Sequence, residues 1–96
     1  LAANKLNGNI SIFVSLGSLQ NLTLSENQFS GMLPTNISIL QNLTVLDLSK
    51  NNITGNIPSS ISNLRRLRTL ELSDNQLTGS IPILNNSMLT DLTLYK

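Results

Sequence analysis

Few residues in this sequence could do chemistry, and the clearest candidates are the carboxylates of Asp47 and Glu71. They lie 24 residues apart in two similar segments, so stacking those segments would bring the two side chains together. Such a pair could act as an acid/base dyad or hold a cation. The chain has no His and no Cys, so the usual zinc, haem and thiolate ligands are missing. We therefore predict no enzyme, no cofactor and no metal site, and interpret the pair as a solvated surface or a ligand contact.

Cationic residues form a second cluster, with Arg65, Arg66 and Arg68 supplying half of the six Lys and Arg residues. An acidic polysaccharide or an acidic protein patch could bind there, although such a triplet is more often a solvated turn. Nucleic acid is excluded as a partner, because the net charge is only +1 and no aromatic residues are interleaved. No apolar run approaches the roughly 18 residues of a membrane-spanning helix, so no span is expected.

A repeat of 23 or 24 residues must position these side chains. The tetrapeptide at residues 24–27 recurs with small changes at 48–51 and 72–75, and each copy ends in Asn. A Gly follows four residues after each such Asn, and a Pro usually follows three residues after that Gly. The pattern therefore predicts one segment of about four repeats plus the start of a fifth. The predicted repeats are 1–23, 24–47, 48–71 and 72–93.

Each repeated position has a physical role. The alternation in Leu46-Asp47-Leu48 predicts a short strand with one buried face, and stacked copies about 4.8 Å apart would form a parallel sheet. The Gly residues suit positive φ or close backbone approach, and leucines spaced by three after the Ile-Pro pairs favour 3₁₀ returns. A carboxamide both donates and accepts hydrogen bonds, so the repeated Asn can serve backbone groups in two directions. We predict a buried ladder of Asn4, Asn27, Asn51 and Asn75.

The stretch from Leu46 to Leu67, with its Leu-x-Leu-x-x-Asn-x-Ile-x-Gly-x-Ile-Pro pattern, resembles the plant-specific subclass of leucine-rich repeats. The resemblance implies an α/β-type repeat solenoid. It would be a right-handed superhelix with a parallel sheet on its concave face, a short second sheet, and 3₁₀ or loop returns on its convex side. Similar repeats form ectodomains of receptor-like kinases and receptor-like proteins, and polygalacturonase-inhibiting proteins. The resemblance therefore implies an extracellular or cell-surface location.

Outward residues of the predicted strands should form columns on the concave face, a rigid surface for a partner. One further column, Glu26, Lys50, Asp74 and Lys96, alternates in sign and is interpreted mainly as a stabilising ladder. The predicted ligand-binding residues are Asn21, Thr23, Glu26, Val45, Asp47, Lys50, Thr69, Glu71, Asp74, Asp91, Thr93 and Tyr95.

Six Asn-x-Ser/Thr motifs are candidate glycosylation sites, which secreted proteins use on exposed loops. Most map to turns or return segments, whereas Asn21 maps to the edge of a strand. The acceptors are Asn9, Asn21, Asn36, Asn42, Asn52 and Asn85.

Two functions remain open from the sequence. The first is an extracellular recognition module that binds a protein, peptide or glycan, including a cell-wall polysaccharide, through its concave face. The alternative is a structural glycoprotein segment that stacks end to end into a filament or coat. It rests on the missing cysteine-bearing caps that related ectodomains carry, which would leave ends able to self-associate or to continue into a longer solenoid.

Overall fold

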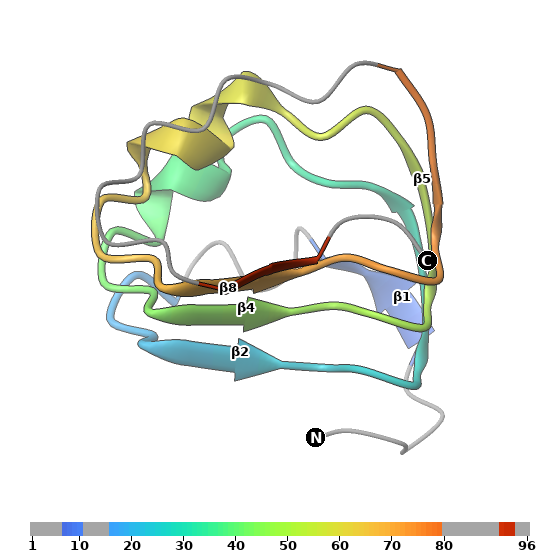
Figure 1. Ribbon diagram of the computed structural model, residues 1–96, viewed down its shortest axis with the longest axis horizontal. Helices are drawn as coiled ribbons and strands as arrows, with labels where there is room; N and C mark the ends of the chain where they lie inside the picture. The colour runs from blue at the N-terminus through green and yellow to red at the C-terminus, as the bar shows by residue number, and fades with distance from the viewer. Residues whose placement is uncertain (1–6, 11–15, 80–90, 94–96) are drawn as a thin grey trace.

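Two parallel sheets of short strands wind around one core in the computed structural model, which describes residues 7–10, 16–79 and 91–93 (Figure 1). The inner sheet has the order β2-β4-β6-β8 and the outer sheet the order β1-β3-β5-β7. The inner strands are β2 (Asn21–Thr23), β4 (Val45–Asp47), β6 (Thr69–Glu71) and β8 (Asp91–Thr93). The outer strands are β1 (Asn7–Asn9), β3 (Gln28–Met32), β5 (Asn52–Gly55) and β7 (Gln76–Leu77). The predicted repeat solenoid with a parallel sheet and a short second sheet is confirmed.

In the return segments between β3 and β6, the chain forms the 3₁₀ helices η2 (Ile37–Ile39) and η3 (Ser59–Asn63), which lie across the core from the inner sheet (Figure 1). Each follows a proline, and Pro58 before η3 has extended backbone, with φ −68° and ψ 141°. The prolyl carbonyl oxygen accepts the first bond of each helix, from Ile37 N–H at 3.2 Å and from Ile61 N–H at 3.1 Å. The predicted 3₁₀ returns are therefore present.

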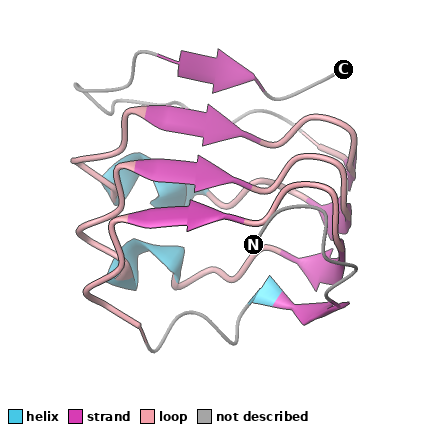
Figure 2. Ribbon diagram, turned by 90° about the horizontal axis from the view of Figure 1, so that it is seen from below, coloured by secondary structure: helices cyan, strands magenta, loops and turns pink. Residues whose placement is uncertain are grey.

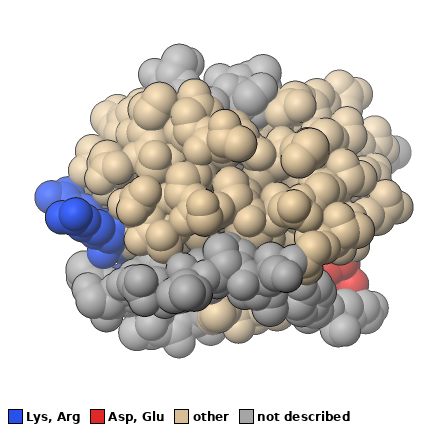
Figure 3. Space-filling view, turned by 90° about the horizontal axis from the view of Figure 1, so that it is seen from above, with Lys and Arg blue, Asp and Glu red and all other residues tan. Residues whose placement is uncertain are grey.

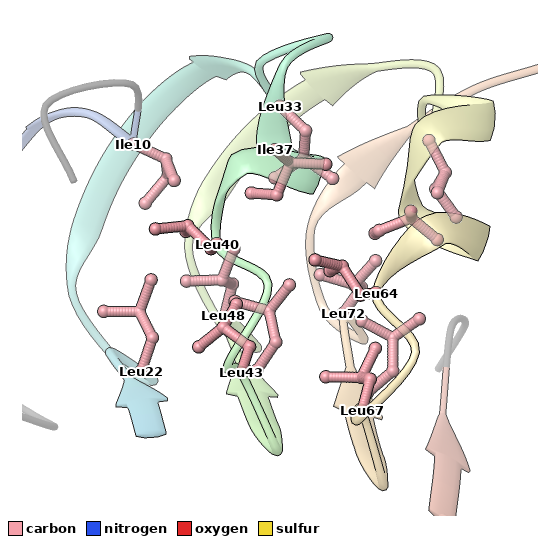
Figure 4. Packing of buried hydrophobic residues seen from close by; sticks show 14 of the residues in the cluster. Ile10, Leu22, Leu33, Ile37, Leu40, Leu43, Leu48, Leu64, Leu67 and Leu72 are labelled. Atoms are coloured by element: carbon pink, nitrogen blue, oxygen red, sulfur yellow. The ribbon is translucent and has the colours of Figure 1, made fainter. Parts of the chain in front are cut away.

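Leucines and isoleucines from successive coils stack on one another to form the core (Figure 4). The middle residues of the inner strands, Leu22, Leu46 and Leu70, are in register and buried. Burying one such side chain stabilises a fold by roughly 1.5–3 kcal/mol, and here each side chain depends on the coils above and below for its cover. Figure 2 shows the inner strands side by side, which is the stacking that this burial requires.

Beyond β2, β4 and β6, the chain turns through a residue with left-handed backbone. Glu26, Lys50 and Asp74 have φ of 57°, 57° and 59°. Glu26 N–H still donates to Ser49 O at 3.0 Å, so the turn stays hydrogen-bonded to the next coil. The inner strands end at Thr23, Asp47 and Glu71, so these charged residues stand in the turns that follow the strands. L-residues adopt this conformation at a cost of about 1–2 kcal/mol.

Gly55 shows why the outer sheet needs glycine. Its φ is +79°, and a Cβ built there would lie 2.8 Å from both Cγ and Cε of Met32 in the preceding coil. Glycine therefore suits the backbone conformation at this position, and a larger residue would also have to displace the Met32 side chain. Among the residues described, no helix is long and apolar enough to cross a bilayer.

Candidate functional site

The exposed face of the inner sheet brings eight of the predicted binding residues into two in-register rows, on either side of the row of leucines that includes Leu22, Leu46 and Leu70. Parallel pairing places equivalent residues of the four strands opposite one another. Row 1 consists of Asn21, Val45, Thr69 and Asp91. Row 2 consists of Thr23, Asp47, Glu71 and Thr93. We call these two rows the recognition face.

The rows differ in chemistry from strand to strand. In row 1, Asn21 is exposed and Val45 and Thr69 are half-buried, so an amide, an aliphatic group and a hydroxyl stand next to one another. In row 2, Asp47 and Glu71 are half-buried neighbours and Thr93 is exposed. Within β2, the Thr23 hydroxyl donates to Asn21 Oδ1 at 2.5 Å and thereby joins the two rows. The predicted Tyr95 lies outside the described residues.

The Asp47 carboxylate accepts hydrogen bonds from the turn that follows its strand. Ser49 donates to Asp47 Oδ1 from its backbone N–H at 3.1 Å and from its hydroxyl at 2.7 Å. Ser49 itself is buried, so its hydroxyl stabilises the turn and is not offered to a partner. The sequence carries a signal for this contact, because an Asp side chain often accepts hydrogen bonds from the residue two positions later in a turn. In the described part of the chain, no three His, Cys, Asp or Glu residues are grouped to hold a metal.

The charged turn residues do not form the predicted ladder of ion pairs between Glu26 and Lys50. Both side chains are exposed, and no ion pair joins them in the part of the chain that the structure describes. Asp74 is half-buried at the equivalent turn, and Lys96 lies outside the described residues. The left-handed residues lie past the ends of the inner strands and so belong to neither row 1 nor row 2.

The arginine cluster lies at the other end of the inner strands, in the turn between η3 and β6. Arg65, Arg66 and Arg68 are exposed, and Arg66 Nη1 donates to Asn42 Oδ1 of the preceding coil at 2.9 Å. Figure 3 shows basic side chains at one edge of the visible surface and acidic side chains at the opposite edge. The cluster is thus beside the inner sheet and outside the recognition face.

The asparagine ladder runs along the turns between the two sheets. Asn51 is buried, and its Oδ1 accepts Phe29 N–H of the preceding coil at 3.0 Å. Its Nδ2 donates to Leu24 O at 2.9 Å and to Leu48 O and Ser49 O of its own coil. One carboxamide therefore joins two coils.

The neighbouring ladder residues have the same local contacts. Asn75 Oδ1 accepts Ile53 N–H at 3.0 Å, and its Nδ2 donates to Leu48 O at 2.9 Å. The buried Asn27 donates to Leu24 O at 3.0 Å and to Ser25 O. Asn4 lies outside the described residues. The ladder therefore fixes the turns that follow the strands of the recognition face.

The glycosylation candidates lie in different surroundings. Asn36 is exposed in the turn before η2, and Asn42 is half-buried in a turn. Asn9 and Asn52 are exposed, but they belong to β1 and β5. Their expected place in turns is wrong, because the outer sheet begins one residue after the ladder Asn51. Asn21 stands in row 1, and Asn85 lies outside the described residues.

Comparisons with known proteins agree with this architecture. The family model described as leucine rich repeat matches residues 17–77. The BIR3–SERK2 complex from Arabidopsis thaliana contains a chain of 42% identity and TM-score 0.91, covering 99% of this chain and 53% of that one. The ectodomain of the Arabidopsis thaliana receptor kinase SOBIR1 has 42% identity and TM-score 0.85, covering 93% of this chain and 50% of its own.

A longer receptor shows the same likeness over a smaller share of its length. The Arabidopsis receptor kinase HAESA, solved with the peptide hormone IDA and the co-receptor SERK1, has 36% identity and TM-score 0.87. The match covers 93% of this chain and 15% of the HAESA complex chain. Among curated proteins, none matches the sequence. This chain spans about half of the length of the matched chain in the BIR3–SERK2 complex (53%) and of the SOBIR1 ectodomain (50%). On the family match and these structures, the chain belongs to the leucine rich repeat family.

Proposed function

We propose that this chain is part of an extracellular recognition module that binds a protein or peptide through the recognition face. The observation that carries the proposal is the pair of in-register rows on a hydrogen-bonded sheet. Similar structures support it, since HAESA was solved with a peptide hormone and a co-receptor, and BIR3 with SERK2.

The geometry suits an extended partner that crosses the strands. Neighbouring strands of a sheet lie about 4.8 Å apart, so the partner meets a different side chain at each step. Row 1 offers the aliphatic Val45 between the polar groups of Asn21 and Thr69, which gives an apolar contact with hydrogen-bonding groups beside it. Because the strands are already ordered, binding loses little backbone entropy on this side of the interface.

The other predicted partners depend on other parts of the molecule. Contact with an acidic polysaccharide would use Arg65, Arg66 and Arg68, which lie outside the recognition face. The filament alternative depends on contacts between coils of different molecules and stays a prediction from the sequence.

Selection of binding peptides tests the proposal. A random library of displayed peptides is selected on the folded protein, and the enriched peptides are measured against Val45→Arg. An arginine in the middle of row 1 should weaken binding at least about tenfold, because a central contact is lost and a charge is desolvated. The matched control is Ser59→Arg, which places the same side chain on the exposed start of η3 and should leave binding unchanged. Equal affinity for wild type and Val45→Arg would contradict the proposal.

A further inference from the structure

Two adjacent asparagines have opposite surroundings. Asn51 is buried, and its carboxamide forms four hydrogen bonds within two coils. Asn52 is exposed, and its side chain forms no hydrogen bond with the described residues. Only Asn52 begins an Asn-x-Ser/Thr motif, with Thr54 two residues later. Asn51, which holds two coils together, lacks the acceptor motif. Asn52, whose side chain has no such structural role, has the motif.

Asn36 repeats the arrangement of Asn52 in another element. It is exposed, it precedes η2, and its side chain does not cap that helix. In both motifs the residue after the Asn, Ile37 or Ile53, is fully buried. The core therefore anchors the backbone next to each Asn, while the amide remains in solvent where a bulky group can be attached without disturbing the packing.

We propose that Asn36 and Asn52 carry N-linked glycans, which lie away from the recognition face. The inference rests on the extracellular location in the proposed function. In the transfer, Asn Nδ2 forms a bond to C1 of an oligosaccharide held on a lipid diphosphate. The C1–O bond to the diphosphate breaks, the amide nitrogen loses one proton, and the lipid diphosphate leaves. A transferase of the secretory pathway of a eukaryotic host catalyses the step.

The two acceptors belong to elements that contribute no residue to row 1 or row 2. Asn36 precedes a helix that lies across the core from the inner sheet, and Asn52 starts a strand of the outer sheet (Figure 1). A glycan on Asn21 would instead stand in row 1 beside Val45. The positions of Asn36 and Asn52 thus allow a glycosylated surface and a bare recognition face on the same coils.

Mapping of the sites tests the inference. The protein is secreted from a eukaryotic host, its folding is checked by circular dichroism, and peptides are treated with an amidase in ¹⁸O water, which labels each formerly glycosylated Asn. We expect label at Asn36 and Asn52. Ser38→Ala and Thr54→Ala should each remove one glycan. Ser38→Thr and Thr54→Ser keep the acceptor motif and should keep the glycan. Unlabelled Asn36 or Asn52 in folded, secreted protein overturns the inference.

A second measurement separates this inference from the proposed function. The peptides selected on the recognition face are measured against the protein before and after enzymatic glycan removal. We expect the affinity to change less than twofold, since the glycans lie elsewhere. A larger change overturns the claim that the face is bare. Labelled sites together with insensitivity to Val45→Arg would overturn the proposed function alone, and unlabelled sites with a sensitive Val45 would overturn the glycan inference alone.

Discussion

The asparagine ladder and the recognition face lie on the same coils but differ in how strictly each position restricts its residue type. The ladder has the same residue at 27, 51 and 75, whereas row 1 has Asn21, Val45 and Thr69 at equivalent strand positions. A ladder side chain bonds to the backbone of two coils, and only a carboxamide supplies the donor and the acceptor that this requires. A row residue needs only to tolerate a half-buried strand position, which many side chains do.

The difference shows where stability and recognition are separated in this chain. Asp47 and Asn51 are four residues apart, yet one stands on the recognition face and the other inside the turn. Substitutions in the rows can therefore change which partner binds while the coils remain stacked.

The largest effect should come from Asn51→Leu. The substitution leaves the buried Phe29 N–H without an acceptor. It also removes one of the donors to each of three carbonyl oxygens, those of Leu24, Leu48 and Ser49, which keep one other donor each. Leaving a buried polar group unsatisfied costs about 1–3 kcal/mol, so we expect the free energy of unfolding to fall by about 3 kcal/mol. Urea denaturation followed by circular dichroism measures it. Asn52→Leu is the adjacent control and should change stability by less than about 0.5 kcal/mol, because Asn52 is exposed. Similar losses in both variants would disprove the ladder's special role.

A smaller loss should follow Gly55→Ala. Alanine at φ +79° has strained backbone, and its Cβ would contact the Met32 side chain at 2.8 Å. We expect a loss of about 2 kcal/mol in thermal or chemical unfolding, of which about 1–2 kcal/mol is the left-handed conformation. In a Met32→Ala background the steric part disappears, so Gly55→Ala should then cost less. An unchanged cost in that background would show that Met32 moves aside freely.

Lys50→Gly should raise stability slightly. Lys50 has φ 57° and an exposed side chain, so glycine relieves the left-handed strain of about 1–2 kcal/mol. Glycine also gives the unfolded chain more entropy, which offsets roughly 0.5–1 kcal/mol of the gain. We expect a net increase of about 0.5 kcal/mol, visible as a higher urea midpoint. Lys50→Ala serves as the control, because alanine keeps the strain, and a midpoint that rises equally in both variants would point to charge as the cause.

The sequence predicts the stacked strands well, because the spacing of leucines and asparagines is a direct consequence of one coil lying on the next. The register that aligns Asp47 with Glu71 follows from the same spacing. The left-handed turn at Lys50 is not predicted, since a charged residue carries no signal for positive φ. The burial of Ser49 also depends on the turn geometry, because its hydroxyl reaches back to Asp47 only once the chain has bent. Local backbone geometry therefore decides the limits of the recognition face, and periodicity alone does not show it.

The smallest change in stability should come from exchanging two residues within row 1, in the double variant Val45→Thr, Thr69→Val. The two positions are paired across β4 and β6, both are half-buried, and both residues favour strands. We expect the free energy of unfolding to change by less than about 0.5 kcal/mol. The peptides selected on the wild-type face should nevertheless bind less tightly, because the aliphatic group and the hydroxyl have changed places.

This exchange has no counterpart in the ladder, where every position holds the same residue. If the exchange lowers stability by more than about 1 kcal/mol, the row positions are constrained by coil stacking as the ladder is, since tolerated surface changes stay well below that value. If stability and binding both stay the same, the partner does not contact row 1, and row 2 with Asp47 and Glu71 becomes the part of the face to test. Only unchanged stability with altered binding supports a face whose chemistry is free to vary on a fixed stack of coils.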